Sequence, residues 1–221
     1  MNRMVEGGQV SDAVAVERAL AGDADAFRVL VERHSRNLFR LAHRMSGNRH
    51  DAEEIVQEAF LRAYQKLRQF ESRANFGTWV YRIAANCAID RLRKQRNQDA
   101  RREDDSANEE SGATSGLQKH PDTRPTPERA AASVELRMKI EQALAGLSAA
   151  ERAAFVMRHW EGRGIEEIAG VLRLKPSAAK NTVFRAVQKL RQALEVYAMK
   201  RGGVRAGAMD AALGAAPGTD G

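Results

Sequence analysis

One strip of side chains between Asn75 and Arg96 combines an aromatic ring, an amide and charged groups. The strip is made of Trp79, Arg82, Asn86, Asp90 and Arg93, at intervals of three or four residues. This spacing places them on one face of a helix. A cationic face with a ring for stacking and an amide for hydrogen bonding fits a phosphate backbone with exposed bases. A surface helix with ordinary solvated charges is the alternative, and this stretch alone leaves both open.

A second face of the same stretch is apolar, so the strip needs other helices to hold it in place. That face consists of Phe76, Val80, Ile83 and Cys87. Three amphipathic segments precede it, and their predicted N-caps are Ser11 or Asp12, Asp23 and Asp51. These four helices predict a compact all-α unit over residues 11–97, preceded by a flexible N-terminus over residues 1–10.

A second helical unit is predicted over residues 127–198. No apolar period exists over residues 98–126, which indicates a flexible linker, and residues 199–221 form a Gly/Ala-rich tail expected to be disordered. Ser148 and Glu151 form a predicted capping box. A short helix from Ile165, a tight turn and a last helix from Pro176 are typical of a helix-turn-helix.

The last helix is expected to bury one stripe and to expose a polar, basic edge. The predicted buried stripe is Val183, Val187, Leu190 and Leu194, and the exposed edge includes Lys180, Asn181, Phe184, Arg185 and Lys189. An ordinary helical hairpin is the alternative, but the basic edge near the start of the helix favours DNA reading.

The composition agrees with an anionic partner in a reducing compartment. The 221 residues include 36 Lys and Arg against 29 Asp and Glu, a formal net charge of +7. The single cysteine, Cys87, cannot form a disulfide within the chain and is expected to be a buried structural thiol. No apolar run is long enough to span a bilayer, so we expect a soluble, cytoplasmic protein without membrane insertion.

Three motifs together resemble a known family. DAEEIVQEAFLRAYQKL, FGTWVYRIAANCAIDRLRKQ and ERAAFVMRHWEGRGIEEIAGVLRLKPSAAKNTVFRA occur in this order, with the linker between the last two. Over about residues 12–97 and 127–195 the chain resembles the extracytoplasmic-function (group IV) sigma factors of the sigma-70 family. This resemblance implies an all-α fold of two small domains, sigma region 2 and sigma region 4, joined by the flexible linker.

The resemblance also implies a function and partners. The chain would bind core RNA polymerase, through the largest-subunit clamp helices and the flap, and would direct initiation at promoter DNA. It would read the minus-thirty-five element and melt the minus-ten element, without cofactors or catalysis. Members of this family are usually held inactive by an anti-sigma factor.

The resemblance assigns three sets of residues. The polymerase-binding set, an acidic and amide face suited to a basic coiled coil, is Asp51, Glu54, Gln57, Glu58, Phe60 and Leu61. The minus-ten set is Asn75, Trp79, Arg82, Asn86, Asp90 and Arg93, with Asn86 lining a pocket for a flipped base and the loop 71–75 closing over it. The minus-thirty-five set is Lys180, Asn181, Phe184, Arg185 and Lys189. In addition, the basic run from Arg91 to Arg96 in the first unit would steer DNA.

Two other functions compete with this interpretation. A helix-turn-helix regulator that never joins the polymerase would leave the face of Glu54, Gln57 and Glu58 unexplained. A helical metal-dependent hydrolase built on His50, Glu53 and Glu54 would need a second ligand cluster, a phosphate loop or a nucleophile motif, and the sequence contains none. We therefore expect neither a metal site nor an enzyme.

Overall fold

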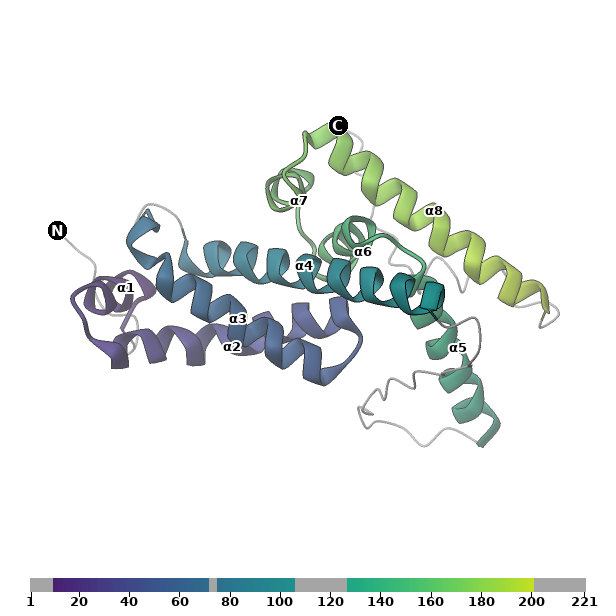
Figure 1. Ribbon diagram of the computed structural model, residues 1–221, viewed down its shortest axis with the longest axis horizontal. Helices are drawn as coiled ribbons and strands as arrows, with labels where there is room; N and C mark the ends of the chain where they lie inside the picture. Colours follow the sequence, from purple (N-terminus) through teal and green to yellow (C-terminus); the bar gives the residue numbers. More distant parts are fainter. Residues whose placement is uncertain (1–9, 72–74, 106–126, 201–221) are drawn as a thin grey trace. The chain divides into compact units, whose positions relative to one another are not determined.

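The computed structural model of the protein describes residues 10–71, 75–105 and 127–200. The chain divides into two compact units, Met1–Ser115 and Gly116–Gly221. Within the described ranges each unit is built from helices without strands (Figure 1), which confirms the predicted all-α class. Among the helices of these ranges, none has both the length and the apolar character that a membrane crossing requires.

The first unit packs three long helices together, with a shorter helix against them. Its elements are α1 (Asp12–Leu20), α2 (Ala24–Ser46), α3 (Arg49–Gln65), a 3-10 turn (Leu67–Gln69) and α4 (Phe76–Asp105). Helices α2, α3 and α4 lie side by side (Figure 1). Their shared core contains Leu30, Leu38, Leu41, Met45 and Val80, all fully buried. This packing fixes which faces of α3 and α4 remain open to a partner.

The predicted helix starts of this unit are confirmed at two places and wrong at a third. The side chain of Ser11 accepts a hydrogen bond from Val14 N at 3.4 Å, and Asp23 accepts one from Ala26 N at 3.1 Å. At α3 the N-cap is Asn48, whose Oδ1 accepts from the backbone N of Asp51 at 2.7 Å. Asp51 therefore lies inside the first turn, where its carboxylate accepts hydrogen bonds from other side chains.

Helix α4 is longer than predicted. The apolar period ends near Arg96, and the linker was expected to start at residue 98, but the helix continues to Asp105. Arginine, glutamine, alanine and glutamate have good intrinsic helix propensity, so the helix continues without an apolar face. Of the flexible segments predicted at residues 1–10, 98–126 and 199–221, residues 1–9, 106–126 and 201–221 lie outside the described residues, and residues 199 and 200 belong to the last helix.

Over residues 127–200, the second unit consists of four helices and one irregular turn. These are α5 (Pro127–Ala145), α6 (Ala149–Phe155), a π-helical turn (Val156–Trp160), α7 (Ile165–Leu172) and α8 (Pro176–Lys200). Its core cluster is Leu144, Leu147, Phe155, Ala186 and Leu190. The predicted capping box is confirmed: Glu151 N donates to Ser148 Oγ at 3.2 Å, and Ser148 N donates to Glu151 Oε2 at 2.9 Å.

Helices α7 and α8 confirm the predicted helix-turn-helix. The turn begins at Arg173, which has a φ of 55° in the left-handed region. Of the predicted buried stripe, Leu190 and Leu194 are buried, Val187 is half-buried against the core cluster, and Val183 is half-buried, whereas Thr182 is 3% exposed. The hydroxyl of Thr182 donates to the carbonyl of Ala178 at 2.8 Å, so this polar side chain can be buried without losing a hydrogen bond.

Candidate polymerase and nucleic-acid interfaces

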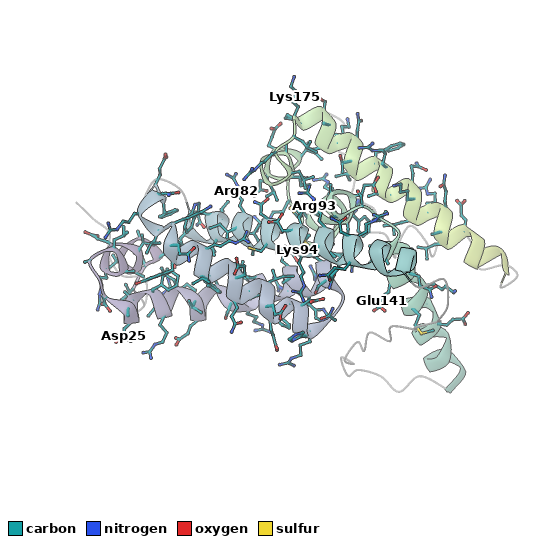
Figure 2. All side chains as sticks on the ribbon, viewed as in Figure 1. Asp25, Arg82, Arg93, Lys94, Glu141 and Lys175 are labelled. Atoms are coloured by element: carbon teal, nitrogen blue, oxygen red, sulfur yellow. The ribbon has the colours of Figure 1, made fainter. Side chains whose placement is uncertain are left out.

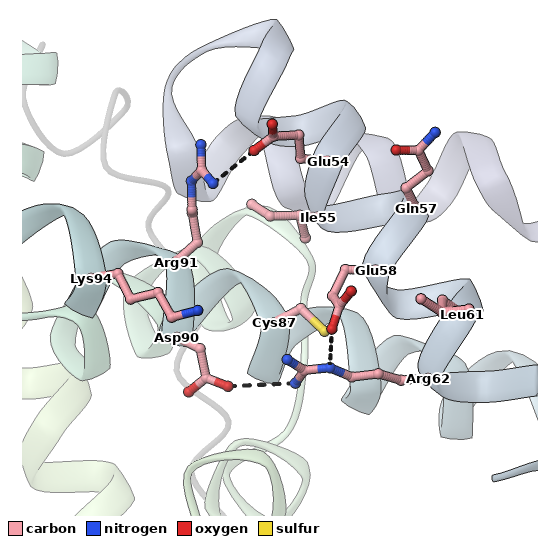
Figure 3. Close-up of a pocket in the computed structure, with 10 residues that line it drawn as sticks. All are labelled: Glu54, Ile55, Gln57, Glu58, Leu61, Arg62, Cys87, Asp90, Arg91 and Lys94. Carbon is pink, nitrogen blue, oxygen red and sulfur yellow. Dashed lines mark hydrogen bonds and ion pairs between the residues drawn. The ribbon is translucent and has the colours of Figure 1, made fainter. Parts of the chain in front are cut away.

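A groove of about 600 Å³ lies between α3 and α4 (Figure 3). Its lining comprises Glu54, Ile55, Gln57, Glu58, Leu61, Arg62, Cys87, Asp90, Arg91 and Lys94. Four residues of the predicted polymerase-binding set therefore meet on one surface: Glu54, Gln57, Glu58 and Leu61. Leu61 is 54% exposed, which is unusual for a leucine in a packed unit and leaves apolar surface for a partner.

The charge of this groove differs from the acidic face that the sequence predicted on α3. Its lining contains three carboxylates, of Glu54, Glu58 and Asp90, and three cations, of Arg62, Arg91 and Lys94. The sequence missed Arg62 and Arg91 as groove residues. Arg62 could have been found, because it lies four residues after Glu58 on one helix face. Arg91 could not, because it lies forty residues away from its partner Asp51.

Two members of the predicted polymerase-binding set lie in the interior, which corrects their expected place on this surface. Phe60 is 7% exposed and Asp51 is 4% exposed. Asp51 accepts hydrogen bonds from Arg91 Nη2, from Asn48 Nδ2 and from Gln95 Nε2, the last at 2.6 Å. Burial alone would raise the pKa of Asp51, but these hydrogen bonds outweigh it and lower the pKa below its ordinary value. Asp51 therefore holds α4 on α3 as a carboxylate.

Cys87 is 5% exposed and lines the inner side of the groove. Burial raises the pKa of its thiol. The side chain therefore stays protonated and acts as a small apolar residue, in agreement with the predicted structural role.

The predicted minus-ten set, which consists of the strip and Asn75, divides into side chains open to a partner and side chains with structural partners. Arg82 and Arg93 are exposed on α4 (Figure 2), and Arg93 is 4.0 Å from the nearest oxygen of Asp90. Asn86 is half-buried, and its Nδ2 donates to the carbonyl of Arg82 at 2.8 Å. These three side chains are the part of the strip that a single strand could meet.

The other three members of the minus-ten set have structural partners. Asn75 caps α4, because its Oδ1 accepts from Thr78 N at 3.0 Å. The ring of Trp79 packs against Phe70, with centroids 5.1 Å apart. Asp90 forms an ion pair with Arg62 at 3.5 Å. Residues 72–74 of the loop that was expected to close over a flipped base lie outside the described residues.

The exposed edge of α8 carries four members of the predicted minus-thirty-five set. Lys180, Asn181, Phe184 and Arg185 are all exposed, and Phe184 is 62% exposed. They occupy the first turns of the second helix of the helix-turn-helix, the part that reaches base edges in this motif.

Lys189, the fifth member, is tied to the unit itself. Its Nζ lies 2.8 Å from Oε2 of Glu151, which is 6% exposed. Burial alone would raise the pKa of Glu151, but the hydrogen bonds from Lys189 and from the backbone of Ser148 lower it below its ordinary value. The side chain of Lys189 is 52% exposed, as predicted, but this ion pair competes with a contact to DNA, so the role of Lys189 at DNA stays a prediction.

His50, Glu53 and Glu54, which the alternative metal-dependent hydrolase would use as ligands, contact neighbouring side chains on α3. His50 lies 3.3 Å from Glu54, and Arg49 lies 2.7 Å from Glu53. Among the described residues, no group of three or more His, Cys, Asp or Glu side chains could hold a metal ion.

Comparison with known families matches both units. A family model described as sigma-70 region 2 matches residues 30–98, and one described as sigma-70, region 4 matches residues 137–190. The chain is 33% identical over 182 residues to the ECF RNA polymerase sigma factor SigW of Bacillus subtilis, covering 81% of this chain and 94% of that protein. It is 31% identical over 191 residues to the RNA polymerase sigma-H factor of Pseudomonas aeruginosa, covering 85% of this chain and 95% of that protein.

Solved structures share the fold. CnrH, in complex with the cytosolic domain of CnrY, matches with a TM-score of 0.54 at 24% identity, covering 84% of this chain and 97% of that chain. The sigma factor RpoE of Bartonella quintana, in complex with the anti-sigma factor NepR, matches with a TM-score of 0.53 at 23% identity, covering 77% of this chain and 97% of that chain.

Proposed function

We propose a division of labour between the two units of this chain, which belongs to the extracytoplasmic-function (ECF) RNA polymerase sigma factors. As a sigma factor, the chain binds core RNA polymerase and directs promoter-specific initiation of transcription. The first unit grips the polymerase and opens the minus-ten element, and the second unit reads the minus-thirty-five element.

The groove between α3 and α4 is the observation that carries this proposal. Glu54, Gln57 and Glu58 stand at helical spacing along one rim, and the exposed Leu61 adds apolar surface. A helix of the polymerase clamp with cations on its edge and an apolar side chain between them would fit this arrangement. A helix-turn-helix regulator that acts without polymerase needs only α7 and α8, and it would leave the groove without a role.

Promoter recognition is assigned to α4 and α8. On α4, Asn86 contacts the flipped minus-ten base, and Arg82 and Arg93 hold the backbone of the opened strand. On α8, Asn181 and Phe184 meet base edges, while Lys180 and Arg185 hold phosphates. The flap of the polymerase binds the second unit and sets the distance between the two promoter elements.

An anti-sigma protein is the proposed regulator of this chain. Support comes from CnrH and from RpoE of Bartonella quintana, which share the fold and were solved in complexes with CnrY and with the anti-sigma factor NepR. We further propose that the chain has no catalytic activity of its own and works in the cytoplasm, on the nucleoid when polymerase-bound.

Run-off transcription with bacterial core RNA polymerase over a genomic promoter library tests the proposal. Glu54→Ala with Gln57→Ala should abolish core binding, measured by pull-down at moderate salt. Glu53→Ala is the matched control, because Glu53 is exposed on the same helix but does not line the groove. Absence of core binding by the unmodified chain would overturn the proposed function.

The minus-ten assignment has its own test. Asn86→Ala should bind core polymerase normally but form fewer open complexes, measured by permanganate reactivity of unpaired thymines. If this variant opens promoters as well as the unmodified chain, the flipped-base contact is wrong.

A further inference from the structure

Two arginines cross the groove between α3 and α4 and hold its two acidic rim residues (Figure 3). Arg91 of α4 places Nη1 2.7 Å from Glu54 Oε2. Arg62 of α3 places Nε 2.6 Å from Glu58 Oε1, and its Nη1 lies 3.5 Å from Asp90 of α4. Both carboxylates that would meet the polymerase are therefore already held within the unit.

Arg91 is itself fixed at its other end. Its Nη2 donates to Asp51, which is 4% exposed and is also held by Asn48 and Gln95. A guanidinium is a rigid planar fork, so anchoring one nitrogen in the interior fixes the direction of the other. The buried end thus determines where Glu54 is held.

Holding Glu54 in one conformation favours binding. A surface glutamate without such a partner samples several rotamers, and ordering it at an interface weakens affinity by about two- to tenfold. Arg91 contacts Oε2 of Glu54, and Nε2 of His50 lies 3.3 Å from Oε1. Each carboxylate oxygen can accept a second hydrogen bond, so Glu54 still has acceptor capacity for a donor from a partner.

The neighbouring arginine on α4 has a different environment. Arg93 has a side chain that is 64% exposed, and its nearest carboxylate oxygen, of Asp90, is 4.0 Å away. The basic run from Arg91 to Arg96, which was predicted as a whole to steer DNA, therefore contains two kinds of arginine. Arg91 is held in the groove, whereas Arg93 is open to a phosphate.

We propose that Arg91 is a positioning residue for polymerase binding, which acts by orienting Glu54, and that it makes no contact with DNA. This inference rests on the proposed function, since it requires that Glu54 meets the polymerase.

A double-mutant cycle with the full chain and core RNA polymerase tests the inference. Arg91→Lys keeps a cation for Asp51 but cannot bridge to Glu54 as well, so the unit should stay folded, as checked by a melting curve. We expect this variant to bind core about three- to tenfold more weakly. Glu54→Ala should weaken binding about ten- to a hundredfold, and adding Arg91→Lys to it should cause no further loss.

Promoter binding by holoenzyme at saturating core separates positioning from DNA contact. Arg91→Lys should bind promoter DNA as the unmodified chain does, whereas Arg93→Ala, the matched control, should bind core normally and DNA more weakly. The inference is overturned if Arg91→Lys weakens DNA binding as Arg93→Ala does, or if its effect on core affinity persists in the Glu54→Ala background. An unchanged core affinity of Glu54→Ala alone would instead remove the proposed Glu54 contact, and the positioning role with it.

Discussion

Replacing the buried Asp51 with asparagine tests whether the packing of α4 on α3 depends on a carboxylate. One oxygen of Asp51 accepts from Arg91, and the other accepts from both Asn48 and Gln95. Asparagine has the same shape, but in either orientation its NH₂ group would face a donor. The substitution therefore removes a charge and creates a donor–donor conflict without creating a cavity.

The expected loss follows from the bonds that are broken. Hydrogen bonds to charged groups contribute about 1.5–3 kcal/mol each, and part of this remains where the amide oxygen still accepts. We expect Asp51→Asn to lower the free energy of unfolding of the first unit by about 2–3 kcal/mol at pH 7.

The pH dependence of this loss has a definite sign. The pKa of Asp51 in the folded chain lies below 3.8, the ordinary value that applies to the unfolded chain. The stabilisation by the carboxylate is therefore complete well above pH 3.8 and disappears as the pH falls through the folded pKa. The difference between the unmodified chain and Asp51→Asn should shrink as the pH is lowered through 4.

Urea unfolding followed by tryptophan fluorescence measures this difference in the first unit alone. The chain contains two tryptophans, Trp79 and Trp160, so Trp160→Phe leaves Trp79 as the reporter. Glu53→Gln, an exposed acid on the same helix, is the control and should leave the urea midpoint unchanged. A loss below about 0.5 kcal/mol at pH 7, or a difference that does not depend on pH, would refute the reasoning.

Substitutions at two further positions test the second unit, with Trp160 as the reporter in a Trp79→Phe chain. Arg173→Gly should stabilise the unit by about 1 kcal/mol, because Arg173 has a φ of 55°, in the left-handed region that glycine adopts without strain. Arg173→Ala is the control and should not stabilise the unit. Equal effects of the two substitutions would show that loss of the side chain, and not the backbone conformation, is responsible. Lys189→Ala should destabilise the unit by about 1–2 kcal/mol, because it leaves Glu151 without its cation. If this variant is fully stable but binds promoter DNA poorly, Lys189 is a DNA contact and not a structural residue.

Local chemistry was predictable from the sequence. Ser11, Asp23 and the Ser148–Glu151 box are caps in which a side chain bonds a backbone group three residues away, so the signal lies within one turn. The helix-turn-helix was predictable for the same reason, from a short apolar period, a turn and a second period.

Pairs distant in sequence were not predictable. Asn48 and Asp51 are both good capping residues. Asp51 lies inside because Arg91 and Gln95, forty and forty-four positions later, donate to its carboxylate, and Asn48 caps α3. Phe60 and Leu61 are adjacent apolar residues on one helix, and the rotation of α3 against its neighbours makes the first 7% and the second 54% exposed. Unlike the distant pair, these two could have been distinguished by helical phase, because Phe60 lies beside the stripe of Ile55, Ala59 and Ala63, whereas Leu61 lies on the other side of the helix.

The two units share one arrangement, which changes how the charge of the chain is interpreted. In each unit a carboxylate in the first turn of a helix is buried and bonded to a cation from the long helix that carries the predicted DNA contacts: Asp51 to Arg91 of α4, and Glu151 to Lys189 of α8. Each cation therefore helps to fix the rotation of its helix, and with it the direction of the exposed side chains, and its ion pair competes with binding to a phosphate. The net charge of +7 consequently does not measure the cations available to DNA. Because the salt dependence of binding reports only phosphates that are neutralised, it should follow the exposed Arg82, Arg93, Lys180 and Arg185, and not the two cations that hold the helices in place.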